Sequence, residues 1–193
     1  WRANINSAVK EKRKMMIDSS DVRKLNLNQI RSVMWRGGEH TKQSMALEIG
    51  LSSATCNTLL NEMEENCEVL SEKRQLNGVG RSTSVFRINE QYESILCVKV
   101  EINSDGHREL WIEVLSMLGN RLCHEKRAYK KLDAETIIDR IIDFTVLYSN
   151  ISIILIGISS IVDNGVIRLS DIPELENVPL ESMIKEKTDI PIY

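Results

Sequence analysis

The sequence predicts an α+β protein in two parts, a winged helix-turn-helix followed by a domain built on a mixed sheet. Residues 41–63 have apolar and small side chains at the spacing of two short helices that cross steeply. A Gly-rich turn between two strand-like runs follows directly, at residues 68–88. From residue 92 onwards the hydrophobic pattern changes to that of strands, interrupted by an amphipathic helical pattern at residues 134–148.

Composition limits the class of protein. The chain has 193 residues, which is enough for one or two domains with a sizeable core. Residues 1–92 hold 14 Lys and Arg against 11 Asp and Glu, whereas residues 93–193 hold 11 against 17. A basic front on an acidic remainder favours a DNA-reading head on a domain with another task. The four cysteines form no C-x-x-C pair, and we find no signal peptide or membrane-length apolar run, so we expect reduced, packed thiols in a cytoplasmic protein.

The front of the chain divides into an arm and a DNA-binding domain. Residues 1–20 are polar and basic, and we interpret them as a flexible arm, with residues 1–14 alternatively being sequence ahead of a natural start at Met15 or Met16. Residues 21–36 carry apolar side chains at helical spacing and end at two glycines. This helix is expected to support the pair at residues 41–63, and the winged helix-turn-helix domain is expected to cover residues 21–90.

The helix pair has the capping residues that two helices need. Thr41 and Ser52 can each accept a hydrogen bond from the free amides of a first helical turn. Gly50 can take the positive φ that ends the first helix, and Asn66 is expected to end the second in the same left-handed region.

The outward face of the second helix is short and polar, which suits contact with base edges. A helical hairpin that only packs is the alternative, because short αα turns are common. We expect base contacts from Ser53, Ala54, Asn57, Thr58 and Asn61, and phosphate contacts at the helix N-termini from Lys42, Gln43 and Ser52.

The hairpin at residues 68–88 is interpreted as a wing. Its Gly-rich tip carries Arg81 and Ser82, and an arginine on such a loop can reach a phosphate or enter the minor groove. An ordinary surface hairpin with a solvated arginine is the alternative. The acidic residues Glu62, Glu64, Glu65 and Glu68 leave a third hypothesis open, a winged helix used only for protein contacts.

The second part of the chain predicts a meander of three antiparallel strands at residues 94–101, 109–115 and 121–129. Asp133 is expected to cap the helix that follows. The buried face of that helix is expected to consist of Ile137, Ile138, Ile141, Ile142 and Val146.

An apolar run at residues 151–158 is expected to be a fully buried strand, parallel to the first because a helix crosses over between them. A loop with a tight Asn164-Gly165 turn and a short helix at residues 180–187 follow. Residues 190–193 begin another strand, so we expect the sheet to continue beyond Tyr193 and the domain to be truncated here.

Two segments, GVGRSTSVFRIN and IVDNGVIRLSDIPELENVPLESMIKEKTDIPIY, together with the helix pair, resemble the ROK family (repressors, open reading frames and sugar kinases). The closer resemblance is to the N-terminal portion of its transcriptional regulators, such as xylose and N-acetylglucosamine repressors, and it covers residues 25–193. It implies a DNA-reading head on an actin-like (ribonuclease-H-like) sugar-sensing body, with residues 91–193 as its first lobe. The implied protein is a repressor of carbohydrate-utilisation genes that responds to a sugar or sugar derivative. A homodimer on double-stranded operator DNA is expected, because one short helix reads too few bases.

The chain departs from the kinases of that family. Their first strand leads into an Asp-x-Gly-x-Thr phosphate loop, whereas residues 100–106 read VEINSDG here. We therefore expect no enzyme activity, with an ATP-dependent ROK sugar kinase as the alternative.

The resemblance places few ligand-binding residues within this segment. The zinc motif of the family would follow beyond Tyr193, and the three histidines are dispersed, so no cofactor or metal is expected here. A turn and a surface connection are the alternative for the positions where the family's first lobe touches its ligand. These positions are Ser159, Ser160, Ser170 and Asp171.

Overall fold

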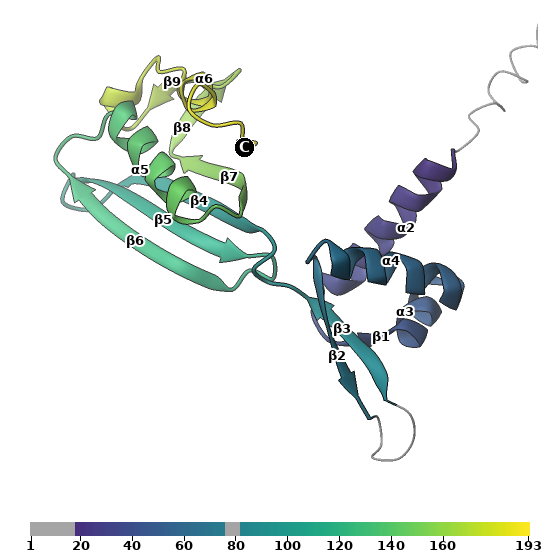
Figure 1. Cartoon of the computed structure of the whole chain (residues 1–193). Helices are drawn as coiled ribbons and strands as arrows, with labels where there is room; N and C mark the ends of the chain where they lie inside the picture. Colours follow the sequence, from purple (N-terminus) through teal and green to yellow (C-terminus); the bar gives the residue numbers. More distant parts are fainter. Residues whose placement is uncertain (1–17, 76–81) are drawn as a thin grey trace, which may run out of the picture. The chain divides into compact units, whose positions relative to one another are not determined.

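The computed structural model describes residues 18–75 and 82–193 and divides into two compact units, Trp1–Ile88 and Asn89–Tyr193. We call them the head and the body and describe each by itself (Figure 1). Most of the expected arm and the tip of the expected wing, including Arg81, lie outside the described residues. Within the described part of the chain, no helix is long and apolar enough to cross a membrane.

The described head has three helices, α2 (Ser19–Met34), α3 (Lys42–Ile49) and α4 (Ser53–Glu65). The two predicted caps are confirmed. Thr41 Oγ1 accepts a hydrogen bond from the Ser44 amide at 3.0 Å, and Ser52 Oγ accepts one from the Thr55 amide at 3.1 Å. Gly50 ends α3 with a φ of 71°, as its lack of a Cβ allows.

The helix α4 ends at Glu65, as expected, but the left-handed residue predicted after it is wrong by one position. Asn66 has a φ of −83° and its amide still donates to Glu62 O at 3.0 Å, as in the helix. The left-handed residue is Cys67, with a φ of 61°, because the chain closes there through a 2.8 Å hydrogen bond from the Glu68 amide to Met63 O. Cys67 is therefore exposed and not a packed thiol, whereas Cys56 is buried.

A three-stranded sheet in the order β1-β3-β2 completes the head. The strands β2 (Val69–Arg74) and β3 (Thr83–Ile88) pair antiparallel, as the hairpin pattern predicted. The two-residue strand β1 (His40–Thr41) adds to the other edge of β3, and the sequence did not predict it. The head core beneath this sheet has fully buried side chains at Ile30, Met34, Met45, Leu60, Met63 and Phe86.

A partly buried ion pair joins α2 to the start of the hairpin. Glu68 is only 4% exposed. The Arg31 guanidinium donates from Nε to Glu68 Oε1 at 2.6 Å and from Nη2 to Oε2 at 2.9 Å. This two-pronged contact satisfies both carboxylate oxygens and fixes the end of α4 against the supporting helix.

The body is built on a four-stranded sheet in the order β6-β5-β4-β7. The predicted meander is confirmed in β4 (Ser94–Ile102), β5 (Arg108–Ser116) and β6 (Arg121–Tyr129). The strand β7 (Ile151–Ile158) pairs parallel to β4, as expected for a strand reached through a crossover helix.

The final residues of the chain extend the same sheet. Ile192 forms a parallel bridge with Ile154 of β7, so the expected strand start at residues 190–193 is confirmed.

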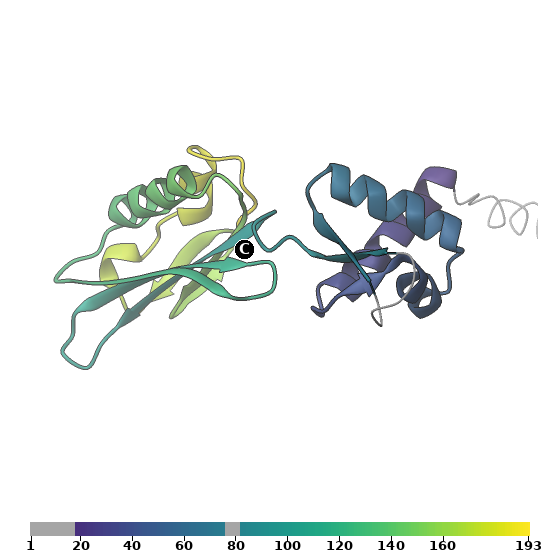
Figure 2. The ribbon, with the colours of Figure 1, turned by 60° about the horizontal axis from the view of Figure 1, so that its bottom comes forward.

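One face of this sheet packs against α5 (Ala134–Leu147), which Figure 2 shows lying over the sheet. Asp133 caps α5, accepting from the Thr136 amide at 2.9 Å. Two predictions are wrong. Val146 is 78% exposed and Phe144 is buried instead, because the inward stripe runs through Ile137, Ile141 and Phe144 at helical spacing. The strand β7 is also not fully buried, since alternate residues face away from the core and Leu155 is 39% exposed.

The remainder of the body is a hairpin and two short helices. The strands β8 (Ser160–Asp163) and β9 (Val166–Ser170) pair antiparallel around Asn164 and Gly165, which both have positive φ. A Cβ at Gly165 would overlap the Glu181 side chain, so this turn requires glycine. The 3₁₀ helix η2 (Pro173–Leu175) and the helix α6 (Leu180–Lys185) follow, and their buried residues join the core between the sheet and α5.

Candidate nucleic-acid interface

The helix α4 has one packed face and one open polar face. Its packed face buries Cys56, Leu59, Leu60 and Met63 in the head core. The opposite face carries the residues predicted to read bases. Four of them, Ser53, Ala54, Asn57 and Thr58, are exposed, and Asn61 is half-buried. The structure therefore brings all five onto one accessible surface, which we call the α4 face.

Lys42 reaches this surface from the neighbouring helix. Its Nζ donates to Asn57 Oδ1 at 2.5 Å and to Asn61 Oδ1 at 2.9 Å. The ammonium also lies 5.4 Å from the centre of the Phe86 ring. The sequence placed Lys42 at the N-terminus of α3, and it is the first residue of that helix, but its charged end lies over the α4 face. The other two residues predicted at helix N-termini, Gln43 and Ser52, are exposed.

A groove separates the start of α4 from α2. It has a volume of about 400 Å³, and Ala54 and Thr58 form part of its wall together with Val22, Arg23 and Asn26 of α2. The Thr58 hydroxyl donates to Ala54 O at 3.2 Å, so its proton is held within the helix. Ala54 and Thr58 thus border both the α4 face and this groove.

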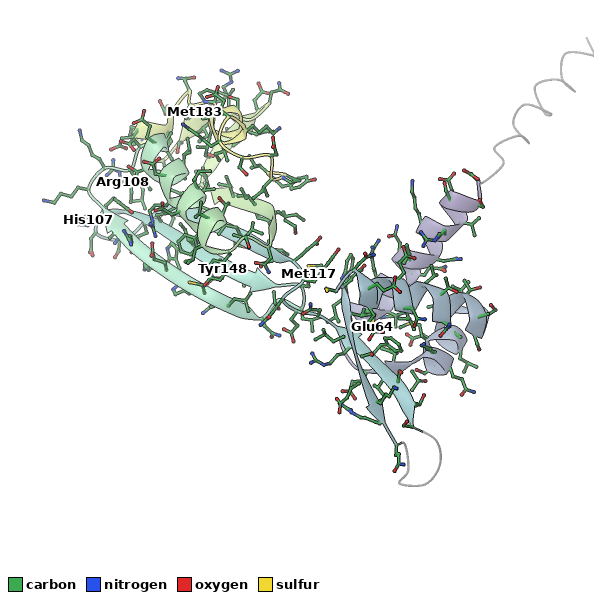
Figure 3. The ribbon with its side chains drawn as sticks, viewed as in Figure 1. Glu64, His107, Arg108, Met117, Tyr148 and Met183 are labelled. Atoms are coloured by element: carbon green, nitrogen blue, oxygen red, sulfur yellow. The ribbon has the colours of Figure 1, made fainter. Side chains whose placement is uncertain are left out.

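The acidic residues near the end of α4 are largely engaged inside the head. Glu62 pairs with Arg23 of α2, and the Glu68 carboxylate is held by Arg31. Glu64, labelled in Figure 3, accepts a hydrogen bond from Ser71 Oγ of β2. Three of the four acidic side chains therefore hold the helix to its neighbours, which weakens the case for an acidic docking surface.

The described part of the hairpin carries an ionic cluster near its tip. Arg74 Nη2 donates to Glu72 at 2.8 Å, and Nη1 donates to Glu39 at 2.6 Å. The hydrogen bond to Glu72, followed by the one to Glu39, raises the pKa of Arg74 above its ordinary value. Ser82 is exposed immediately before β3, whereas Arg81 lies outside the described residues.

In the body, the loop after β4 is closed on itself. Asn103 Oδ1 accepts from the amides of Asp105 at 3.0 Å and His107 at 2.9 Å, and Asn103 O accepts from the Gly106 amide at 3.0 Å. Arg108, which Figure 3 labels beside His107, pairs with Glu174 at 3.1 Å. A phosphate loop needs free amides that converge on the ligand, whereas three amides of this loop already have partners within it.

The residues predicted to touch an effector lie together at the open end of the β8–β9 hairpin. Ser160 is opposite Ser170 in the strand register, and the Asp171 amide donates to Ser159 O at 3.5 Å. Ser170 Oγ accepts from the Ile172 amide at 3.0 Å, so it also closes the turn that follows β9.

A cavity of about 170 Å³ in the body has a different lining. It is mostly apolar, and none of the four predicted effector residues lines it. Its lining residues are Ile156, Ile158, Val162, Gly165, Ile167, Leu180, Glu181, Ile192 and Tyr193.

Within the described residues, no group of three or more His, Cys, Asp or Glu is placed to hold a metal ion.

The described residues form an α/β protein of two units, with a helix pair and hairpin in the head and a mixed sheet in the body.

Comparison with known proteins finds a solved structure with a similar fold. A solved ROK family transcriptional regulator, described as a homolog of the E. coli MLC protein, aligns with a TM-score of 0.59 at 16% sequence identity. The alignment covers 89% of this chain and 45% of that one, so the chain spans less than half of the solved regulator. The predicted resemblance to ROK regulators is confirmed at the level of the fold.

A second solved structure is Lmo2764 from Listeria monocytogenes, described as a candidate N-acetylmannosamine kinase. It aligns with a TM-score of 0.44 at 17% identity, over 51% of this chain and 33% of that one. No family model and no curated protein matches the chain.

Proposed function

We propose that this chain is a sequence-specific DNA-binding transcriptional regulator whose head is a winged helix-turn-helix. The observation that carries the proposal is the open α4 face, made of short polar side chains on a helix whose other side is packed. A helix with such a face fits the major groove of B-DNA. The hairpin β2–β3 then acts as the wing, with Arg81 and Ser82 toward the DNA backbone or minor groove.

The body is the sensing part of the same proposal. We assign it as the first lobe of an actin-like domain that binds a sugar or sugar derivative, and the regulator as a repressor of carbohydrate-utilisation genes. The fold likeness to a ROK family transcriptional regulator supports this assignment. Two copies would bind a near-palindromic operator, because a single α4 reads too few base pairs for useful specificity.

The alternative, a ROK sugar kinase with a winged head, is disfavoured by the loop after β4. Its amides at Asp105, Gly106 and His107 are bonded to Asn103, so the loop would have to open before it could hold a phosphate. ATP-dependent phosphorylation of a sugar by the full-length protein would overturn our assignment as a regulator without enzyme activity.

A gel-shift titration over a range of salt concentrations tests DNA binding directly. The probes are duplex DNA from upstream of the protein's own gene and a random duplex of equal length. Asn57→Ala is expected to reduce the preference for the upstream duplex by about tenfold, because base contacts carry specificity. Lys24→Ala, which removes an exposed charge from α2, serves as the control and should leave that preference unchanged.

Arg81→Ala tests the wing separately. It should weaken binding to both duplexes and lower the slope of log K against log salt by about 1, because one phosphate contact is lost. If Asn57→Ala and Arg81→Ala both bound the two duplexes like the parent, the assignment of the head as a DNA reader would be wrong.

A further inference from the structure

The contact between Lys42 and the two asparagines of the α4 face has a consequence for base recognition. A lysine ammonium has three donors and no acceptor, so the side-chain atoms that face it must be amide oxygens. The distances of 2.5 Å to Asn57 Oδ1 and 2.9 Å to Asn61 Oδ1 agree with charge-assisted hydrogen bonds. Both amide groups are therefore fixed in one orientation, with their oxygens toward Lys42 and their NH₂ groups turned away from it.

An asparagine that reads adenine uses both ends of its amide, since it accepts from N6 and donates to N7. At Asn57 and Asn61 the accepting end is already occupied by Lys42. Each oxygen keeps a second lone pair. A base amino group that approached it would lie beside the Lys42 ammonium, and the positive hydrogens of the two donors would repel each other. The groups that remain for a base are the two NH₂ groups and the third proton of Lys42, and all of them are donors.

We infer that Lys42 sets the base preference of the α4 face by making it a surface of donors that selects guanine over adenine. Guanine presents two acceptors in the major groove, O6 and N7, whereas adenine presents one acceptor beside an amino group. Lys42 is thus a specificity-determining residue that acts partly through the asparagines it orients. The inference rests on the proposed function, because it requires the α4 face to contact DNA.

The surroundings of the Lys42 side chain hold its ammonium in place. Lys42 is half-buried, and its Nζ lies 5.4 Å from the centre of the Phe86 ring, which is itself 1% exposed in the head core. A charged group held between a packed aromatic ring and two amide oxygens loses less freedom on binding than a solvated lysine does. This arrangement also supplies the α4 face with a positive charge that no residue between Ser53 and Asn61 provides.

The test is selection from a pool of random-sequence duplexes by the full chain, followed by anisotropy titrations of duplexes that differ at one position. Asn57→Ala identifies the relevant positions as those whose base preference relaxes. The parent is expected to prefer guanine there. Lys42→Met, which keeps the stem and removes the ammonium, should lower the guanine-to-adenine affinity ratio by about tenfold.

Two further variants act as controls. Lys42→Arg keeps a positive group with several donors and should retain the preference for guanine. Lys24→Met removes an exposed lysine of α2 and should leave the ratio unchanged. Thermal melts of all variants establish that the head is folded, so a lost preference cannot be assigned to unfolding.

The outcomes separate the inference from the proposed function. A parent protein that selects a sequence but prefers an A·T pair over a G·C pair at the Asn57 positions would overturn the inference alone. So would a Lys42→Met variant with the parent's guanine preference. A folded parent protein that selects no sequence from the pool would overturn the proposed function, and the inference would fall with it.

Discussion

The head and the body bury their side chains by different means. The head core contains Met34, Met45 and Met63, each at most 1% exposed, whereas the body core is dominated by isoleucine, valine and leucine from the sheet and α5. Methionine is flexible and fills irregular gaps, while β-branched residues are stiff at χ1 and pack in fixed rotamers. Directed polar contacts occur in both units, as the Arg31–Glu68 pair and the Thr41 and Ser52 caps in the head, and as the Arg108–Glu174 pair and the Asp133 cap in the body. The two units therefore differ in the apolar side chains that fill their cores, flexible methionines in the head and stiff branched residues in the body, while both add directed polar contacts.

The largest effect is expected from a cavity in the body core. Ile141 of α5 is fully buried against the sheet, so Ile141→Ala should lower the free energy of unfolding of the body by about 3 kcal/mol. Val146→Ala on the same helix should change it by less than about 0.5 kcal/mol, because Val146 is 78% exposed. Urea denaturation measures both variants. Equal losses in the two variants would contradict the packing described for α5.

A smaller loss of stability is expected when the Arg31–Glu68 ion pair of the head is broken. Glu68→Gln replaces the carboxylate that pairs with Arg31 by a neutral amide and should cost about 2 kcal/mol of head stability. Glu65→Gln, at the exposed end of α4, is the matched control and should be close to neutral. If thermal melts of the two variants coincided, the head would not depend on this ion pair.

The smallest expected effect is a difference between the helix caps of the two units in how their contribution to stability depends on pH. Hydrogen bonds from the Thr136 side chain and backbone hold the pKa of Asp133 below its ordinary value of 3.8. Because the folded-state pKa is depressed, the cap contributes stability above that ordinary value and loses it as the pH falls through the lower folded value. Asp133→Ala should therefore cost about 1 kcal/mol at pH 7 and much less at pH 2.

Thr41→Ala in the head provides the comparison, since a hydroxyl cap carries no titrating group in this range. It should cost about 1 kcal/mol with little change between the two pH values. Denaturant titrations at both pH values measure the two caps. A Thr41→Ala loss that vanished at low pH, or an Asp133→Ala loss that persisted, would contradict this distinction.

Most elements of the fold could be predicted because their signals are local. The caps Thr41, Ser52 and Asp133, the left-handed Gly50 and the three strands of the meander follow from residues within a few positions of one another. The parallel pairing of β7 with β4 also followed, because a crossover helix leaves few topologies open. The burial of Phe144 in place of Val146 could have been found from the spacing of Ile137, Ile141 and Phe144.

Other features depend on partners far away in the sequence. The strand β1 is two residues long and exists only because β3, more than 40 residues later, offers it an edge. Cys67 takes the left-handed conformation because Glu68 is drawn toward Met63 O and Arg31, which no pattern around Asn66 indicates. The bridge from Lys42 to Asn57 and Asn61 joins two helices, and it could not be read from either helix by itself.

In that bridge, Lys42, which orients the two amides, lies on α3, whereas Asn57 and Asn61, which carry them, lie on α4. If base preference depends on position 42, a lineage of such regulators could change its operators through one codon in α3 while α4 stayed unaltered. Comparison of recognition helices between relatives would then group together proteins that bind different sites. Position 42 would have to be read with the recognition helix when target sites are assigned from sequence.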